Sequence, residues 1–120
     1  MEILEEVMIK KEKELACIDF DGVLLNPNDI PEGKRMGNPM PGARESLLEI
    51  KKLGYKIVVF TVRGAEKNKG HVEDWLKFYE MPFDEVTNIK QKAAFYIDDL
   101  GLSFVDWPSM IEQVRKVKSL

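Results

Sequence analysis

The sequence predicts a single-domain α/β protein built on a parallel sheet. Short apolar runs rich in β-branched residues alternate along the chain with segments whose apolar residues recur at helical spacing. This alternation predicts parallel strands with helices on both faces, a doubly wound, three-layer, Rossmann-like arrangement. The 120 residues, of which 44% are hydrophobic, suffice for one domain (1–120) with a buried core.

Composition narrows the functional classes. The net charge of -3 provides no global basic field, so nucleic-acid binding is not indicated. Cys17 is the single cysteine, which excludes an intramolecular disulfide. The sequence contains no signal-peptide pattern and no apolar run of membrane-spanning length, so we expect a cytoplasmic protein without a membrane partner.

The first predicted strand covers residues 15–19, an apolar run that ends at an acid. Residues 1–14 before it are charged and weakly patterned, and form an N-terminal extension that fits a short helix or an edge strand equally well. After the strand, residues 26–40 hold three prolines and two glycines, which predicts a loop.

The later elements follow from local signals. Pro41 can open a helix that Gly54 ends, and β-branched residues predict the strand after it. The expected elements are a helix at 41–54, a strand at 55–61, a helix at about 68–80, strands at 83–87, 94–98 and 102–105, and a helix from 108 onward.

Polar side chains stand where the predicted strands stop. Asp19 and Asp21 follow the first strand, Thr61 ends the second, and Asp98 and Asp99 follow the fourth. Right-handed crossovers place the carboxyl ends of parallel strands at one edge of the sheet. We therefore expect these side chains to converge at an edge where α/β proteins bind ligands.

Clustered carboxylates need a cation, and ligands that are all oxygens suit Mg²⁺. Beside Mg²⁺ a carboxylate can attack phosphorus to form an aspartyl-phosphate, while a second acid protonates the leaving oxygen and later activates water. A hydroxyl and a lysine can bind the phosphoryl oxygens. Thr61 and either Lys90 or Lys92 occupy suitable positions for this role.

These motifs resemble, in order, those of the haloacid dehalogenase (HAD) superfamily of aspartyl-phosphate-forming hydrolases. Residues 19–24, Asp-Phe-Asp-Gly-Val-Leu, are similar to the first motif, with Asp19 as nucleophile and Asp21 as general acid/base. Phe60-Thr61 is similar to the second motif, and Ile97-Asp98-Asp99 to the fourth. The resemblance implies a HAD-like fold and a Mg²⁺ site formed by Asp19, Asp21 (through its backbone carbonyl), Asp98 and Asp99.

The third motif resembles that of small HAD-type hydrolases, which carry Thr-Asn-x-Lys-Pro-x-Ala before the last acids. Here residues 87–93 read Thr-Asn-Ile-Lys-Gln-Lys-Ala, which favours Lys90 over Lys92 as the phosphate-binding lysine. Residues 25–40 and the helix at 68–80 are too short to fold as the cap domain that many HAD enzymes carry. The resemblance therefore implies a capless phosphatase whose open site accepts a large phosphorylated substrate or is closed by a second protomer in a homodimer.

The charges around these motifs have simpler interpretations as well. Arg63 and Lys92 are candidate substrate contacts, and the alternative is that they are solvated loop charges. Lys34 and Arg35 could also bind an anionic substrate beyond the phosphate, although solvated charges are the favoured interpretation for them. Two other functions stay open. One is a receiver-type phosphoacceptor domain, although the order of acids and threonine disfavours it. The other is a HAD-like module without turnover.

Overall fold

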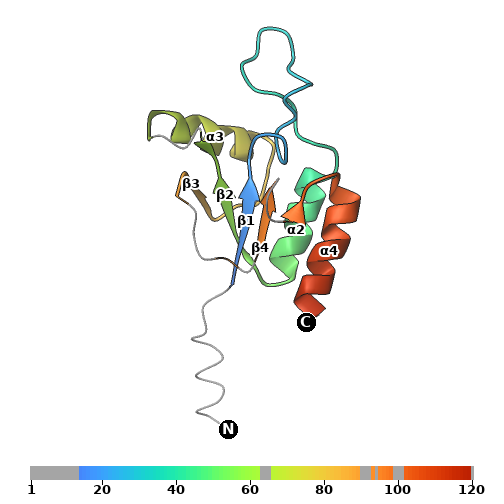
Figure 1. Ribbon diagram of the computed structural model, residues 1–120. Coiled ribbons are helices and arrows are strands. Elements are labelled where there is room, and N and C mark those ends of the chain that lie inside the picture. The colour runs from blue at the N-terminus through green and yellow to red at the C-terminus, as the bar shows by residue number, and fades with distance from the viewer. Residues whose placement is uncertain (1–13, 63–65, 90–92, 94, 99–101, 120) are drawn as a thin grey trace.

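The computed structural model describes residues 14–62, 66–89, 93, 95–98 and 102–119 (Figure 1). Strands and helices follow one another along these residues in the predicted order. The elements are β1 (Leu15–Asp19), α2 (Ala43–Lys52), β2 (Lys56–Phe60), α3 (Glu66–Phe78), β3 (Glu85–Thr87), β4 (Phe95–Asp98), β5 (Leu102–Ser103) and α4 (Trp107–Ser119). None of these helices is long and apolar enough to cross a membrane.

The strands form one parallel sheet in the order β3-β2-β1-β4-β5, so the α/β class and the parallel sheet are confirmed. β1 is the central strand and pairs along its length with β2, from Leu15 opposite Lys56 to Asp19 opposite Phe60. On its other side, Ile18 lies opposite Ile97 of β4. This order places the strand that ends at Asp19 between the strands that end at Phe60 and Asp98.

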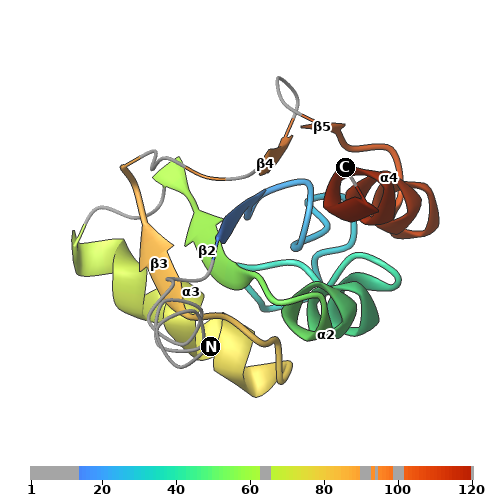
Figure 2. The ribbon, with the colours of Figure 1, turned by 90° about the horizontal axis from the view of Figure 1, so that it is seen from below.

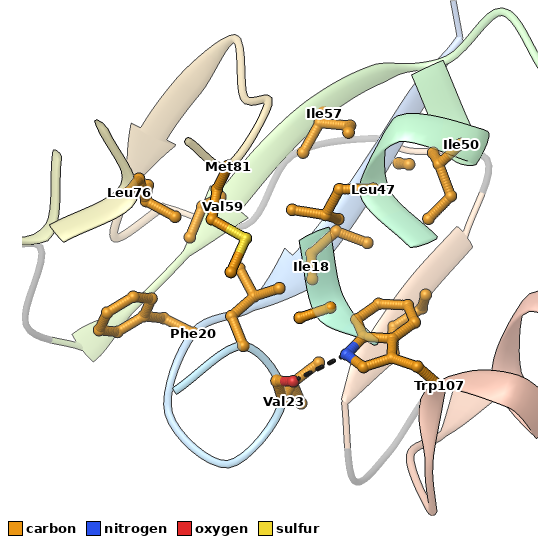
Figure 3. Packing of buried hydrophobic residues seen from close by; sticks show 14 of the residues in the cluster. Ile18, Phe20, Val23, Leu47, Ile50, Ile57, Val59, Leu76, Met81 and Trp107 are labelled. Carbon is orange, nitrogen blue, oxygen red and sulfur yellow. Dashed lines mark hydrogen bonds between the residues drawn. The ribbon is translucent and has the colours of Figure 1, made fainter. Parts of the chain in front are cut away.

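One face of the sheet carries the hydrophobic core. Side chains of paired parallel residues point to the same face, and alternate residues of each strand share it. The buried strand residues of the core cluster all follow this alternation, and they are Ala16, Ile18, Ile57, Val59, Val86, Phe95 and Ile97. The same cluster includes residues of α2, α3 and α4, such as Leu47, Leu76 and Trp107 (Figure 3). The three helices therefore cover the same face, as Figure 2 shows in the view from below.

The opposite face carries Cys17 and Val58, which are buried but do not belong to this cluster. In the described ranges no helix lies on that side, so the doubly wound, three-layer arrangement stays a prediction. The length of the connection between β3 and β4 explains why no described helix lies on this face. The chain passes from β3 to β4, across β2 and β1, in residues 88–94, which is shorter than the dozen or so residues that a helical crossover takes.

Asp84 ties α2 to the sheet below the carboxyl edge. Its carboxylate accepts a hydrogen bond from the Ile57 N–H at 2.7 Å and bonds from Lys51 Nζ at 2.8 and 3.0 Å. Its own N–H donates to the Ile57 carbonyl at 2.8 Å. Partial burial by itself raises the pKa of Asp84, but the bonds from Lys51 and Ile57 outweigh it, so the pKa lies below the usual value.

Asp84→Asn should lower the free energy of unfolding by about 1 kcal/mol at pH 7, because the charged pair with Lys51 is lost at a partly exposed site. A carboxyl whose pKa is depressed by folding stabilises the protein above its unfolded pKa of about 3.9. This contribution is lost as the pH falls through the folded pKa. Urea unfolding at pH 7 and pH 3 should therefore show a difference between wild type and variant that shrinks at low pH. A constant difference would contradict the proposed role of the charge.

Candidate active site

Asp19 and Asp21 lie on either side of a buried phenylalanine, Phe20, at the carboxyl end of β1. Phe20 between them is fully buried in the core, and its N–H donates to the Phe60 carbonyl at 3.0 Å. Alternation along the chain turns the two acids away from that core, and both are half-buried. The carboxylate of Asp19 accepts a bond from the Phe20 N–H at 2.9 Å, which orients it.

The chain leaves Asp21 in a tight helical turn. The Phe20 carbonyl accepts hydrogen bonds from the N–H groups of Leu24 and Leu25, each at 3.0 Å. Gly22 has φ of 82°, a left-handed conformation that glycine adopts without a steric penalty. The indole N–H of Trp107 donates to the Val23 carbonyl at 3.0 Å, as the dashed line in Figure 3 shows. The first turn of α4 therefore fixes the segment that follows the two acids.

Thr61 lies beside the end of β1. It follows Phe60, the residue opposite Asp19, and it is 1% exposed. Its N–H donates to the Thr87 carbonyl at 3.0 Å, so the backbone is fixed on the β3 side too. The structure thus brings the hydroxyl-bearing residue of the second motif to the edge where Asp19 stands.

The backbone of Asp98 also reaches this edge. Because Ile97 lies opposite Ile18, Asp98 at the end of β4 is one residue beyond that pair, level with Asp19. The predicted site residues Arg63, Lys90, Lys92 and Asp99 lie outside the described residues. Within the described part of the chain, no three His, Cys, Asp or Glu side chains gather closely enough to hold a metal ion. Among the described residues, Asp19, Asp21 and Thr61 lie at this edge, and their oxygen atoms are donors that suit a hard cation.

The loop at 26–40, predicted from its prolines and glycines, rises above the carboxyl edge of the sheet (Figure 1). Backbone bonds close its base, with the Asn26 N–H on the Asn38 carbonyl at 2.8 Å and the Met40 N–H on the Leu24 carbonyl at 2.7 Å. A Cβ on Gly37 would lie 1.9 Å from the Asn26 carbonyl oxygen, so the two segments of the loop approach too closely here for any residue other than glycine. The base of this loop is consequently ordered and tightly closed.

The loop also packs on α3, and between them lies a cleft that no feature of the sequence predicts. Two side-chain hydrogen bonds join the loop to α3 and to the residue after it. Trp75 Nε1 donates to the Gly37 carbonyl at 2.9 Å, and the Tyr79 hydroxyl donates to Asn38 Oδ1 at 3.3 Å. We call the space between them the loop–α3 cleft, with a volume of about 940 Å³. Its lining includes Lys34, Arg35 and Met36 of the loop and His71, Trp75 and Phe78 of α3. No local signal joins segments this far apart in the sequence.

Comparisons with known proteins extend to the fold. No family model and no curated protein matches the chain. A conserved protein from Bacteroides thetaiotaomicron has a similar structure, with a TM-score of 0.68 and 20% identity over 88% of this chain and 92% of that one. A structural-genomics target from Vibrio cholerae has a TM-score of 0.52 and 24% identity over 88% of this chain and 97% of that one. At these identities the likeness concerns the fold, and the function has to be argued from the site.

Proposed function

We propose that the protein is a Mg²⁺-dependent phosphohydrolase that acts on phosphomonoesters through an aspartyl-phosphate on Asp19. The observation that supports this proposal is the placement of two half-buried carboxylates, Asp19 and Asp21, at the carboxyl end of the central strand with Thr61 beside them. Ligands of open α/β sheets bind at this edge. The motif resemblance to capless HAD phosphatases, with a doubly wound HAD-like fold, is part of the same proposal.

In this mechanism the two carboxylates have different tasks. An oxygen of Asp19 attacks phosphorus, and the bond from phosphorus to the leaving oxygen breaks as Asp21 donates a proton to that oxygen. Asp21 then accepts a proton from the water that attacks phosphorus, which releases phosphate and restores the Asp19 carboxylate. The Phe20 N–H holds the Asp19 carboxylate in a fixed orientation for the first step.

The remaining predicted residues bind and neutralise the phosphoryl group. The Thr61 hydroxyl and Lys90 would contact its oxygens, with Lys92 as the alternative lysine and Arg63 as a further substrate contact. A Mg²⁺ ion would be held by Asp19, the Asp21 carbonyl, Asp98 and Asp99, and it would supply charge neutralisation. The phosphorylated substrate reaches an edge without a cap, so it can be large, or a second protomer can close the site.

The test is phosphate release from p-nitrophenyl phosphate by the purified full chain. With Mg²⁺ we expect turnover that EDTA abolishes and added Mg²⁺ restores, because the carboxylates repel each other and the phosphoryl group without a cation. The same assay is then repeated with a panel of phosphomonoesters. No turnover with any of them would exclude the hydrolase and favour a module without turnover, while a long-lived phosphoprotein without phosphate release would favour the phosphoacceptor.

A further inference from the structure

The loop–α3 cleft is a formed concavity outside the catalytic residues. Its volume of about 940 Å³ lies within the range of small-molecule sites, roughly 300–1,000 Å³. The hydrogen bonds of Trp75 to Gly37 and of Tyr79 to Asn38 hold its two walls together at the base. Trp75 also packs edge-on against Phe20, with ring centroids 5.1 Å apart, which connects the cleft wall to the residue between the two acids.

One wall of the cleft presents an aromatic surface to solvent. Phe78 is 78% exposed although it lines the cleft, and its ring contacts Tyr79 edge-on at 4.9 Å between centroids. The Trp75 ring, in contrast, is buried and already contacts Phe20 and Tyr79. An exposed phenyl face in a concave site is unfavourable in water and is suited to stacking on a flat ligand ring.

The opposite wall presents positive charge. Lys34 and Arg35 of the loop are exposed, line the cleft, and form no ion pair with any residue of the described ranges. His71 and Asp74 of α3 also line the cleft. Two adjacent cations suit a phosphate, whereas the Asp74 carboxylate suits hydroxyl or amino donors and repels a second anionic group.

We propose that the loop–α3 cleft binds a nucleotide. The base stacks on Phe78, the phosphate contacts Lys34 and Arg35, and Asp74 accepts hydrogen bonds from ribose hydroxyls or from an exocyclic amine. A nucleotide joins a flat ring, a hydroxyl-bearing spacer and an anion within the size of this cleft, which matches its three chemically distinct parts. This inference does not depend on the phosphohydrolase activity.

Equilibrium dialysis with radiolabelled AMP at low, fixed ionic strength tests the proposal. The full chain carrying Asp19→Asn is used beside the wild type, so that binding is measured without turnover. AMP should bind at least about tenfold more tightly than ribose 5-phosphate, which has the same sugar and phosphate but no base to stack. Equal affinity for the two compounds would overturn the proposal, as would tighter binding of a phosphotyrosine peptide.

Variants locate the binding site. Phe78→Ala should weaken AMP binding about 5- to 150-fold through lost stacking, and Phe78→Tyr should retain it. The double variant Lys34→Ala/Arg35→Ala should weaken binding about 2- to 30-fold. Lys52→Ala/Lys56→Ala removes the same charge at the opposite edge of the sheet and should leave binding unchanged. Wild-type affinity in the Phe78→Ala variant would place the nucleotide elsewhere. Equal losses of affinity in the Lys34→Ala/Arg35→Ala and Lys52→Ala/Lys56→Ala variants would do the same.

The two proposals fail separately. Turnover of p-nitrophenyl phosphate without base-dependent AMP binding would leave the phosphohydrolase standing and exclude the nucleotide site. AMP binding that depends on Phe78, without turnover of any phosphomonoester, would leave the nucleotide site standing and exclude the phosphohydrolase. If the wild type releases phosphate from AMP and Phe78→Ala reduces that rate more than the rate with p-nitrophenyl phosphate, the nucleotide is a substrate. If AMP binds without being hydrolysed, it is a ligand of a separate site.

Discussion

Asp19→Asn should reduce phosphate release from p-nitrophenyl phosphate by at least about 10³-fold, because an amide cannot serve as the nucleophile. The fold should survive the change. The amide oxygen can still accept the Phe20 N–H bond, and the Asp19 side chain lies outside the hydrophobic core. Initial rates at saturating Mg²⁺ measure the effect, and circular dichroism checks that the variant is folded.

Two further variants separate the roles of the acids. Asp21→Asn should slow turnover while the chain still binds phosphate in the presence of Mg²⁺, because the proposed metal contact of this residue is its backbone carbonyl. Glu112→Gln makes the same carboxylate-to-amide change on an exposed position of α4 and should leave the rate unchanged. Normal turnover of Asp19→Asn would exclude the phosphoenzyme, and normal turnover of Asp21→Asn would exclude its acid/base role.

Trp107→Ala should be the most destabilising single change, by about 3–5 kcal/mol. The indole is 1% exposed, packs against Phe104 at 5.4 Å between centroids, and donates a hydrogen bond to the Val23 carbonyl. Truncation leaves a cavity and also removes the partner of that carbonyl. For a domain of this size, the melting temperature followed by circular dichroism should fall by about 12–20 °C.

Neighbouring changes show whether packing or the hydrogen bond dominates. Trp107→Phe keeps most of the ring but loses the N–H, so it should cost about 1–3 kcal/mol. Val105→Ala shortens an apolar side chain that is 76% exposed near the same helix start, and it should change stability by less than about 0.5 kcal/mol. A melting temperature for Trp107→Ala within about 2 °C of wild type would show that α4 does not anchor the turn after Asp21.

Local signals predicted the elements well because strand and helix periodicities are properties of short segments. The first strand was predicted at residues 15–19, and β1 covers Leu15–Asp19. The loop at 26–40 follows from its prolines and glycines, which limit regular structure at those positions. The predictions are least accurate at the ends of elements, because capping interactions determine where a helix begins or ends. α4 begins at Trp107 rather than at Pro108, because the Asp106 carboxylate accepts the Ser109 N–H at 2.8 Å and caps the helix.

The sequence also predicted that polar residues at strand ends would meet at the carboxyl edge, since right-handed crossovers bring the ends of parallel strands to one side of the sheet. The observed register places Thr61 and the Asp98 backbone beside Asp19. The loop–α3 cleft had no such signal. From the sequence, Lys34 and Arg35 are expected to be solvated charges, and this describes each residue correctly when its neighbours are not considered.

The sequence by itself thus determined the helices and strands and the acids at the end of the first strand, because hydrophobic periodicity is a property of short segments. Tertiary structure alone decided that the three described helices share one face and that loop 26–40 closes against α3. The decisive contacts join residues far apart in the chain, Trp75 to Gly37 and Trp107 to Val23. Such pairs form only after the chain has folded, so no short window of sequence contains them.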